Sequence, residues 1–422
     1  MVTAPLHGRM ACPAGKSCFD PRWTYVSIME LFVIILSLFA TVCNGEYVDD
    51  FYQRTPLGDS VDIASMKILK ESFQDAKDKN VIVSPLGVLT LLSMYSAGAE
   101  GENRAEILRL TGSSSYKQLE DNYANLTERF SAMDPSYLVL ANKIYVSDQY
   151  TLNEKFSDVA SRSYKSDVER VNFAEKKKTA DRINKWAAEK TKGHISSPVN
   201  EGTIDEDAAL ALFNVIFFQG HWHVLFKAEE TEEKDFFVDE STTVKKPMMK
   251  LLKPLIYFEN KDIEARMVEL PYKEKGFRMV IVLPDKKDGL PAVVEKVAQR
   301  GILQDVMAAN WRDIALEIPK FEIKTNLDLE NILSKVGVSR MFTEGASGVV
   351  REAPVRVSSA FQEAFVKVDE EGATAGAFTA IFIRPVSGNY RPPPAIPFKV
   401  DHPFMFAILH EDIVLFTGTY TH

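Results

Sequence analysis

The stretch DEEGATAGAFTAIFIRPVSGNYRPPPAIPFKVDHPF, residues 369–404, combines a strand pattern with features that no central strand tolerates. From Ala373 onward every second residue is small or apolar, and in an extended chain these side chains share one face: Ala373, Ala375, Ala377, Thr379, Ile381 and Ile383. This alternation predicts a strand with one buried face. The prolines at 392–394 then exclude the centre of a sheet. The stretch therefore has the pattern of a strand followed by that of a loop.

Short motifs on both sides of this stretch follow one another in a recognisable order. Upstream stands AFVKVDEEG (364–372), and downstream DHPF (401–404) opens an apolar hairpin that ends in FTG (416–418). Earlier in the chain come NVIVSPL (80–86), INKW (183–186), TKGHI (191–195), FNVIFFQGHW (213–222), LPY (270–272), MVIVLP (279–284) and IPKF (318–321). Together these motifs resemble the serpin family over about residues 50–420.

The resemblance implies an α+β serpin fold with a large central mixed β-sheet, two further sheets and about nine helices. It also implies an exposed reactive-centre loop at 369–397. No linker rich in glycine, serine or proline interrupts residues 50–370, so we expect 46–422 to form a single domain. The spacing of Ile63, Met66, Leu69 and Phe73 predicts an amphipathic helix. Apolar runs at 81–83, 208–218 and 279–283 predict strands covered on both faces, and a helix and turn are expected over 332–342.

The amino end has the layout of a secretory leader, which we place at residues 1–45. A thirteen-residue apolar run, 31–43, follows scattered basic residues and precedes Gly45, where we expect cleavage. A spanning helix over 25–43 is the alternative, although it would include Glu30. Translation beginning at Met29 is also open. We expect a secreted, extracellular protein that has no membrane attachment after the signal is removed.

The mature chain would contain no cysteine. Cys12, Cys18 and Cys43 all fall in the leader, so disulfides would not contribute to stability. Asn125 heads the sequon Asn125-Leu-Thr127 and is the expected glycosylation site.

Charge argues against a nucleic-acid partner. Removing residues 1–45 takes three of the 50 basic and two of the 59 acidic residues, which leaves a net charge of minus ten. Lys176–Lys178 is the one basic run, and its acidic neighbours indicate a solvated helix face. Some serpins bind heparin through a basic helix, but in 102–129 acidic residues are interleaved with the basic ones. We therefore expect no polyanion cofactor, and no other cofactor.

Motifs for catalysis are missing from the sequence. There is no Gly-x-Ser-x-Gly and no His-Glu-x-x-His, so neither a hydrolase nucleophile nor a metal site is predicted. Gly15-Lys16-Ser17 lacks the earlier glycine of a phosphate loop. His402 precedes Pro403 at a strand start and is expected to be structural. We therefore do not expect an enzyme.

The resemblance implies a single-use inhibitor of an extracellular serine protease, acting as a monomer. Counting fourteen residues from the hinge glycine Gly372 places the reactive bond at Val386–Ser387. The family's hinge would comprise Glu370, Glu371, Gly372, Ala373, Thr374, Ala375, Gly376 and Ala377. After cleavage, 373–385 would insert into the main sheet and trap the acyl-enzyme. The alternative is a non-inhibitory serpin that carries a ligand or acts as a chaperone-like binding protein.

Residues around the reactive bond favour an elastase-like target. Val386 suits a small apolar pocket, whereas Arg384 and Arg391 are both followed by proline, which obstructs cleavage. Tyr390 is the alternative, for a chymotrypsin-like enzyme, if the frame shifts by four residues.

Four residues match the family's sheet-opening region: Ser84, Asn214, Trp222 and Gln362. The family usually has histidine at 362 and commonly serine at 87, where this chain has Gln362 and Gly87. Glutamine both donates and accepts hydrogen bonds, so a polar cluster is still expected. Trp222 is expected at the top of the sheet, with a plain core aromatic as the alternative.

Overall fold

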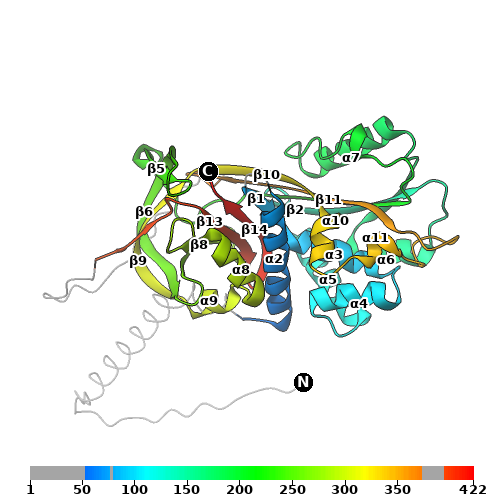
Figure 1. The fold of residues 1–422 in the computed structure, drawn as a ribbon, viewed down its shortest axis with the longest axis horizontal. Coiled ribbons are helices and arrows are strands. Elements are labelled where there is room, and N and C mark those ends of the chain that lie inside the picture. Colours follow the sequence, from blue (N-terminus) through cyan, green and yellow to red (C-terminus); the bar gives the residue numbers. More distant parts are fainter. Residues whose placement is uncertain (1–52, 77–78, 373–393) are drawn as a thin grey trace, which may run out of the picture. The chain divides into compact units, whose positions relative to one another are not determined.

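The computed structural model describes residues 53–76, 79–372 and 394–422, and this part of the chain forms two β-sheets and ten α-helices (Figure 1). The described residues belong to one unit, Tyr52–His422. The helices are α2 (Pro56–Asp75), α3 (Pro85–Ser96), α4 (Gly101–Thr111), α5 (Tyr116–Ser131), α6 (Glu154–Tyr164), α7 (Lys176–Lys190), α8 (Leu290–Arg300), α9 (Leu303–Ala308), α10 (Leu329–Lys335) and α11 (Arg340–Thr343). Two 3₁₀ turns are η1 (Glu201–Thr203) and η2 (Ala228–Glu230).

The smaller sheet has five strands in the order β10-β11-β4-β2-β3. Their bounds are β10 (Phe321–Asp328), β11 (Val357–Val368), β4 (Leu210–Phe218), β2 (Leu138–Ser147) and β3 (Asp167–Val171). β10 with β11 and β2 with β4 are antiparallel pairs, whereas β11 with β4 and β2 with β3 are parallel. Every residue of β4 is buried, as the apolar run predicted. This is the mixed central sheet that the sequence led us to expect.

The second sheet has nine strands, because the long strand β6 (Thr243–Asn260) joins what we expected as two further sheets. β6 pairs with β9 over Met248–Tyr257 and with β7 over Ile256–Asn260. The remaining strands are β1 (Val81–Val83), β5 (Glu232–Phe237), β7 (Ala265–Pro271), β8 (Phe277–Pro284), β9 (Asn310–Pro319), β12 (Ile396–Lys399), β13 (Phe404–His410) and β14 (Ile413–Tyr420). The predicted strands at 81–83 and 279–283 are confirmed as β1 and β8.

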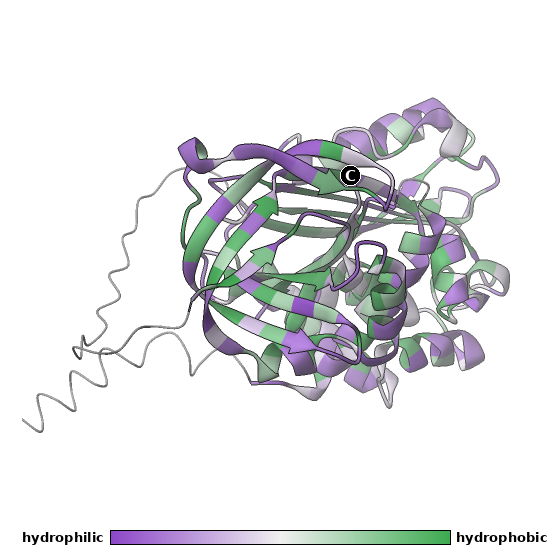
Figure 2. Ribbon diagram, turned by 60° about the vertical axis from the view of Figure 1, so that its left-hand side comes forward, coloured by the Kyte–Doolittle hydropathy of each residue, from purple (hydrophilic) through white to green (hydrophobic). Residues whose placement is uncertain are grey.

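The main core lies between the two sheets, where apolar residues gather on the strands (Figure 2). Phe321 of β10 packs against Phe404 and Phe406 of β13, with ring centroids 5.7 and 5.4 Å apart. A second, smaller core lies on the opposite face of the five-stranded sheet, where α7 places Ile183 and Trp186 over the sheet residue Phe213. The five-stranded sheet is therefore covered on both faces, and any strand entering it must displace packed side chains.

Local sequence explains why two helices begin where they do. Pro56 and Pro85 stand at the first positions of α2 and α3, where a missing N–H does no harm. Thr55 and Ser84 precede them as N-caps, and each hydroxyl accepts a hydrogen bond from a backbone N–H of the first turn. The predicted helix at 63–73 is confirmed within α2. Ser84 thereby sits at the junction of β1 and α3.

Candidate functional site

The contact between β11 and β4 is the parallel pair in the middle of the five-stranded sheet. Its register runs from Val357 opposite Leu210 to Phe365 opposite Phe217. On the outer sides β11 pairs antiparallel with β10, and β4 pairs antiparallel with β2. Parallel ladders have slanted hydrogen bonds and are slightly less stable for each residue than antiparallel ones. The sheet therefore has a weaker contact at its centre.

β11 is followed by a tight turn at Asp369–Gly372. The Asp369 carboxylate accepts hydrogen bonds from the N–H groups of Glu371 and Gly372, at 3.2 and 3.1 Å. Gly372 has a φ of +66°, and a Cβ there would lie 2.5 Å from the backbone nitrogen of Trp222. Only glycine fits this conformation at this distance without strain.

Trp222 fastens this turn to the top of the sheet. Its indole N–H donates to the Asp369 carbonyl oxygen at 2.8 Å. The ring is 3% exposed and stacks on Tyr272, with centroids 4.5 Å apart and planes 10° apart. Trp222 is thus both a core aromatic and a contact of the hinge, so the two readings of the sequence describe one residue.

Glu370, the first residue of the expected hinge, is held by three neighbours. Its carboxylate accepts from the Thr231 hydroxyl at 2.8 Å and pairs with the Lys320 ammonium at 2.6 Å. Its carbonyl accepts from the Phe226 N–H at 3.2 Å. Burial raises the pKa of the Glu370 carboxyl, but the hydrogen bonds from Lys320 and Thr231 outweigh it and leave the pKa below its ordinary value. Glu370 therefore remains ionised and anchored.

Ser84, Asn214 and Gln362 meet in a buried hydrogen-bond cluster below this turn. The Gln362 Oε1 accepts from the Ser84 N–H, and its Nε2 donates to the Ser84 carbonyl and to the Asn214 Oδ1, at 2.8, 2.8 and 2.7 Å. The Ser84 hydroxyl donates to the Leu415 carbonyl at 2.7 Å. Glutamine thus links β11 to both β4 and the start of α3. The three residues lie together, as expected. Trp222 is not part of this cluster and instead contacts the turn at Asp369–Gly372.

Asn142 of β2 completes the cluster and was not anticipated from the sequence. Its Oδ1 accepts from the Asn214 Nδ2 at 2.7 Å, so the chain of hydrogen bonds crosses β11, β4 and β2. No motif marks Asn142, and its role follows only from the register that places it opposite Asn214.

The glycine at position 87, where the family commonly has serine, also has a physical explanation. A Cβ at this position would lie 2.5 Å from the Asn214 Oδ1, so the glycine leaves room for that amide.

His402 is structural, as the sequence predicted. The ring is buried, its Nδ1 contacts the Asp401 carboxylate at 2.8 Å and its Nε2 contacts the Pro284 carbonyl at 2.8 Å. Burial raises the pKa of the Asp401 carboxyl, but the hydrogen bond from His402 outweighs it, so the pKa lies below its usual value. Both ring nitrogens contact groups of the protein itself, as expected of a structural histidine.

Several predicted residues lie outside the described part of the chain. They are the hinge residues Ala373, Thr374, Ala375, Gly376 and Ala377, the reactive-bond pair Val386 and Ser387, and the alternative Tyr390. Asn125 is described and lies exposed on α5, while Thr127 of its sequon is buried and donates its hydroxyl to the Tyr123 carbonyl.

Most of the basic residues that the sequence singles out on α4, α5 and α7 form ion pairs. Lys176, Lys177 and Lys178 of α7 pair with Glu206, Asp181 and Glu175. On α4 and α5, Arg109 pairs with Glu102 and Lys117 with Asp121. Within the described ranges there is no cluster of three metal-ligating side chains, and none of the helices has the length and apolar character that a membrane crossing requires.

Comparison with known proteins gives this geometry a family. The family model described as serpin (serine protease inhibitor) matches residues 60–422. An antitrypsin of Bombyx mori is 28% identical, and the match covers 93% of this chain and 99% of the relative. The structure of Serpin48, a highly specific serpin of the insect Tenebrio molitor, has a TM-score of 0.76 at 28% identity, covering 90% of this chain and 100% of that one.

A third similarity concerns the fold alone. Human thyroxine-binding globulin, solved in complex with its hormone, has a TM-score of 0.77 at 21% identity, covering 87% of this chain and 98% of that one. The architecture is thus common to proteins with different tasks. With the family model matched from residue 60 to residue 422 and a mixed β-sheet at the centre of the fold, the chain belongs to the serpin family.

Proposed function

We propose that this serpin is a secreted suicide-substrate inhibitor of an extracellular serine protease. The parallel contact between β11 and β4, with the anchored turn at Glu370–Gly372 beside it, is the observation that carries the proposal. A strand that turned back at Gly372 and entered this contact would run antiparallel to both neighbours. One parallel ladder would be replaced by two antiparallel ones.

The gain from such an insertion is large enough to do mechanical work. A backbone hydrogen bond contributes roughly 1 kcal/mol net, so a strand made from residues 373–385 would add on the order of 10 kcal/mol. Two costs oppose this gain. β11 must separate from β4, and the hydrogen bond of Gln362 with Asn214 that joins the two strands must break. The uncleaved protein would thus be held short of its most stable arrangement by a barrier.

The chemistry would come from the protease. Its serine hydroxyl attacks the Val386 carbonyl carbon, the peptide bond to Ser387 breaks, and an ester forms at Val386. The hydroxyl proton passes through the protease histidine to the released amine of Ser387. Insertion of 373–385 then moves the ester-linked protease before water completes the hydrolysis. Small residues at 373, 375 and 377 favour fast insertion, because a larger side chain passing into a packed sheet costs about 1–3 kcal/mol.

Val386 favours an elastase-like protease as the target, since a small apolar side chain fits a shallow apolar pocket.

The proposal extends to the processing and assembly of the chain. It comprises a leader at 1–45 that is removed, a single mature domain over 46–422, a monomer, and glycosylation at the exposed Asn125. Amino-terminal sequencing of secreted material tests the leader, and a mass shift after glycosidase treatment tests Asn125.

The deciding experiment is incubation with pancreatic elastase followed by denaturing electrophoresis. We expect a covalent complex that is absent when the elastase serine is chemically blocked. Plain cleavage without a complex would contradict inhibition. A ligand carrier with an inert loop would also show no rise in melting temperature after loop cleavage, whereas insertion raises it by tens of degrees for a gain on the order of 10 kcal/mol.

A further inference from the structure

Within the described residues, the first half of β2 has an edge without a strand beside it, on which the Leu138 N–H bonds to the Asp134 carbonyl at 3.5 Å and the Asn142 carbonyl accepts from the Ser166 hydroxyl at 2.7 Å. β3 pairs with β2 only from Lys143 to Ser147, so the edge of 138–142 that faces away from β4 has no strand beside it in the described chain. The Tyr137 carbonyl accepts from the Gln219 N–H on the β4 side at 2.8 Å. Because backbone groups alternate along a strand, Leu140 points its N–H and C=O to the opposite side, toward the open edge.

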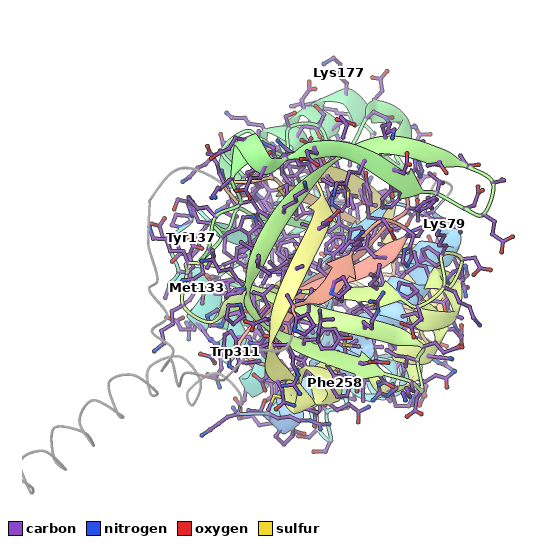
Figure 3. All side chains as sticks on the ribbon, turned by 90° about the vertical axis from the view of Figure 1, so that its left-hand side faces the viewer. Lys79, Met133, Tyr137, Lys177, Phe258 and Trp311 are labelled. Carbon is purple, nitrogen blue, oxygen red and sulfur yellow. The ribbon has the colours of Figure 1, made fainter. Side chains whose placement is uncertain are left out.

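A cavity of about 320 Å³ runs along this edge. Its walls come from the end of α5, the end of α6, and α7, through Phe130, Tyr164 and Trp186, while Leu138–Asn142 form its floor. These three rings are 5%, 3% and 6% exposed, so the walls are firm. Figure 3 labels Met133, which also lines the cavity, and Tyr137 close to each other on one side of the molecule. The volume is at the lower end of ligand sites and admits a short segment of chain.

The mouth of the cavity is basic. Lys165 and Lys190 both line it. Lys165 pairs with Glu128 at 2.9 Å, whereas Lys190 is exposed and has no carboxylate within ion-pair distance in the described residues. An acidic group on an occupant would therefore find a cation at the mouth that is not already engaged.

We propose that the open edge of Leu138–Asn142 binds an extended peptide segment of a partner protein by strand addition. The segment's backbone hydrogen-bonds with Leu140, one small apolar side chain enters the cavity against Phe130, and a neighbouring carboxylate, which alternation points to the other face, pairs with Lys190 of α7. Main-chain bonds then supply affinity, while the cavity and the lysine supply selectivity. This site is separate from the β11–β4 contact and does not depend on protease inhibition.

The probe is fluorescein-labelled acetyl-Thr-Val-Glu-Val-Thr-amide, titrated with the full-length secreted protein and followed by fluorescence anisotropy. We expect binding to be weakened about tenfold when alternate peptide amides are methylated, since the bonds to the edge are lost. Lys190→Glu should weaken binding about tenfold as well. Lys185→Glu, the same charge change elsewhere on α7, serves as its control and should change binding less than about twofold.

A second measurement locates the peptide without any variant. Hydrogen exchange should show that the Leu140 amide becomes protected when the peptide is added. The amides of β2 that face β4 should not change. Equal binding of the methylated peptide would overturn strand addition, and equal effects of the two lysine variants would overturn the contact of the peptide carboxylate with Lys190. Strand addition would also be overturned by entry of the aromatic anion 8-anilinonaphthalene sulfonate into the cavity while the peptide fails to bind, because the cavity would then be a small-molecule site.

Discussion

The Lys320 ammonium lies 2.6 Å from the Glu370 carboxylate, and this ion pair joins the start of β10 to the turn that ends β11. Lys320 is 38% exposed and Glu370 12%, so solvent screens the pair only in part. The contact fixes the turn at the end of β11, beside the β11–β4 contact where a strand would enter.

Glu370→Gln and Lys320→Gln should each lower the barrier to sheet opening. We expect each to reduce the free energy of unfolding by about 1 kcal/mol, and to speed loss of inhibitory activity on warming. The double variant Glu370→Lys with Lys320→Glu restores the opposite charges and should recover most of this loss. Urea unfolding and timed activity assays measure both effects. A double variant worse than either single change would show that the charges do not act as a pair.

Gly87→Ala should strain the buried cluster, because the new Cβ would lie 2.5 Å from the Asn214 Oδ1. We expect destabilisation by about 1–3 kcal/mol, the usual cost of overpacking. In an Asn214→Ala background the same change should cost much less, since the clashing amide is gone. A double-mutant cycle in urea gives the coupling, and full additivity would argue against the contact.

Ala375→Glu should turn the protein from inhibitor into substrate, because insertion would bury a carboxylate without a partner. Thr374→Glu is the matched control, since alternation places this residue on the outward face. We expect the control to keep most of the covalent complex with elastase on a denaturing gel, while Ala375→Glu gives cleaved protein only. The same yield of complex from both variants would contradict insertion.

Val386→Arg should redirect inhibition toward trypsin-like proteases. We expect the rate of inhibition of such a protease to rise at least about a hundredfold, because the aspartate in its specificity pocket pairs with the arginine side chain. Tyr390→Arg tests the shifted frame and should leave the elastase complex unchanged. Mass spectrometry of the released carboxyl-terminal fragment identifies the bond directly. If Tyr390→Arg alone abolishes the elastase complex, the reactive bond lies four residues further on.

Asp62 makes stability depend on pH. Burial raises the pKa of its carboxyl to about 7, although the N–H groups of Leu303 and Ile302 hydrogen-bond to it. The ordinary pKa of this carboxyl is 3.8, so the stability that Asp62 contributes is fully present below about pH 4 and is lost as pH rises from about 4 to about 7.

Asp62→Asn removes this ionisation and keeps an acceptor for both N–H groups. We expect the variant to be more stable than the parent at pH 7.5, by about 2 kcal/mol, and to lose the advantage near pH 4. Urea midpoints at the two pH values measure the difference. An unchanged pH dependence would mean that another group is responsible.

Much of the fold was predictable because strands and helices leave local patterns. Unbroken apolar runs at 81–83 and 279–283 became β1 and β8, and the spacing of Met66, Leu69 and Phe73 matched α2. The joining of two sheets through β6 was not predictable, since strand pairing depends on contacts far apart in sequence.

The site divides in a similar way. Resemblance brought Ser84, Asn214 and Gln362 together, and the structure confirms their contact. Asn142 escaped notice because an asparagine inside an ordinary strand has no signal until register places it beside Asn214. Lys320 stood in the IPKF motif, yet its pairing with Glu370 across fifty residues is visible only in three dimensions.

The parallel register of β11 with β4 gives the proposed inhibitor a finite working life. Where a better-paired sheet is reachable but blocked, what declines with time is the active fraction, and its half-life depends on the height of the barrier rather than on an equilibrium constant. Storage, warming and mild denaturant would each consume active molecules irreversibly. Age and thermal history of a sample would therefore govern its inhibitory titre as strongly as its concentration does.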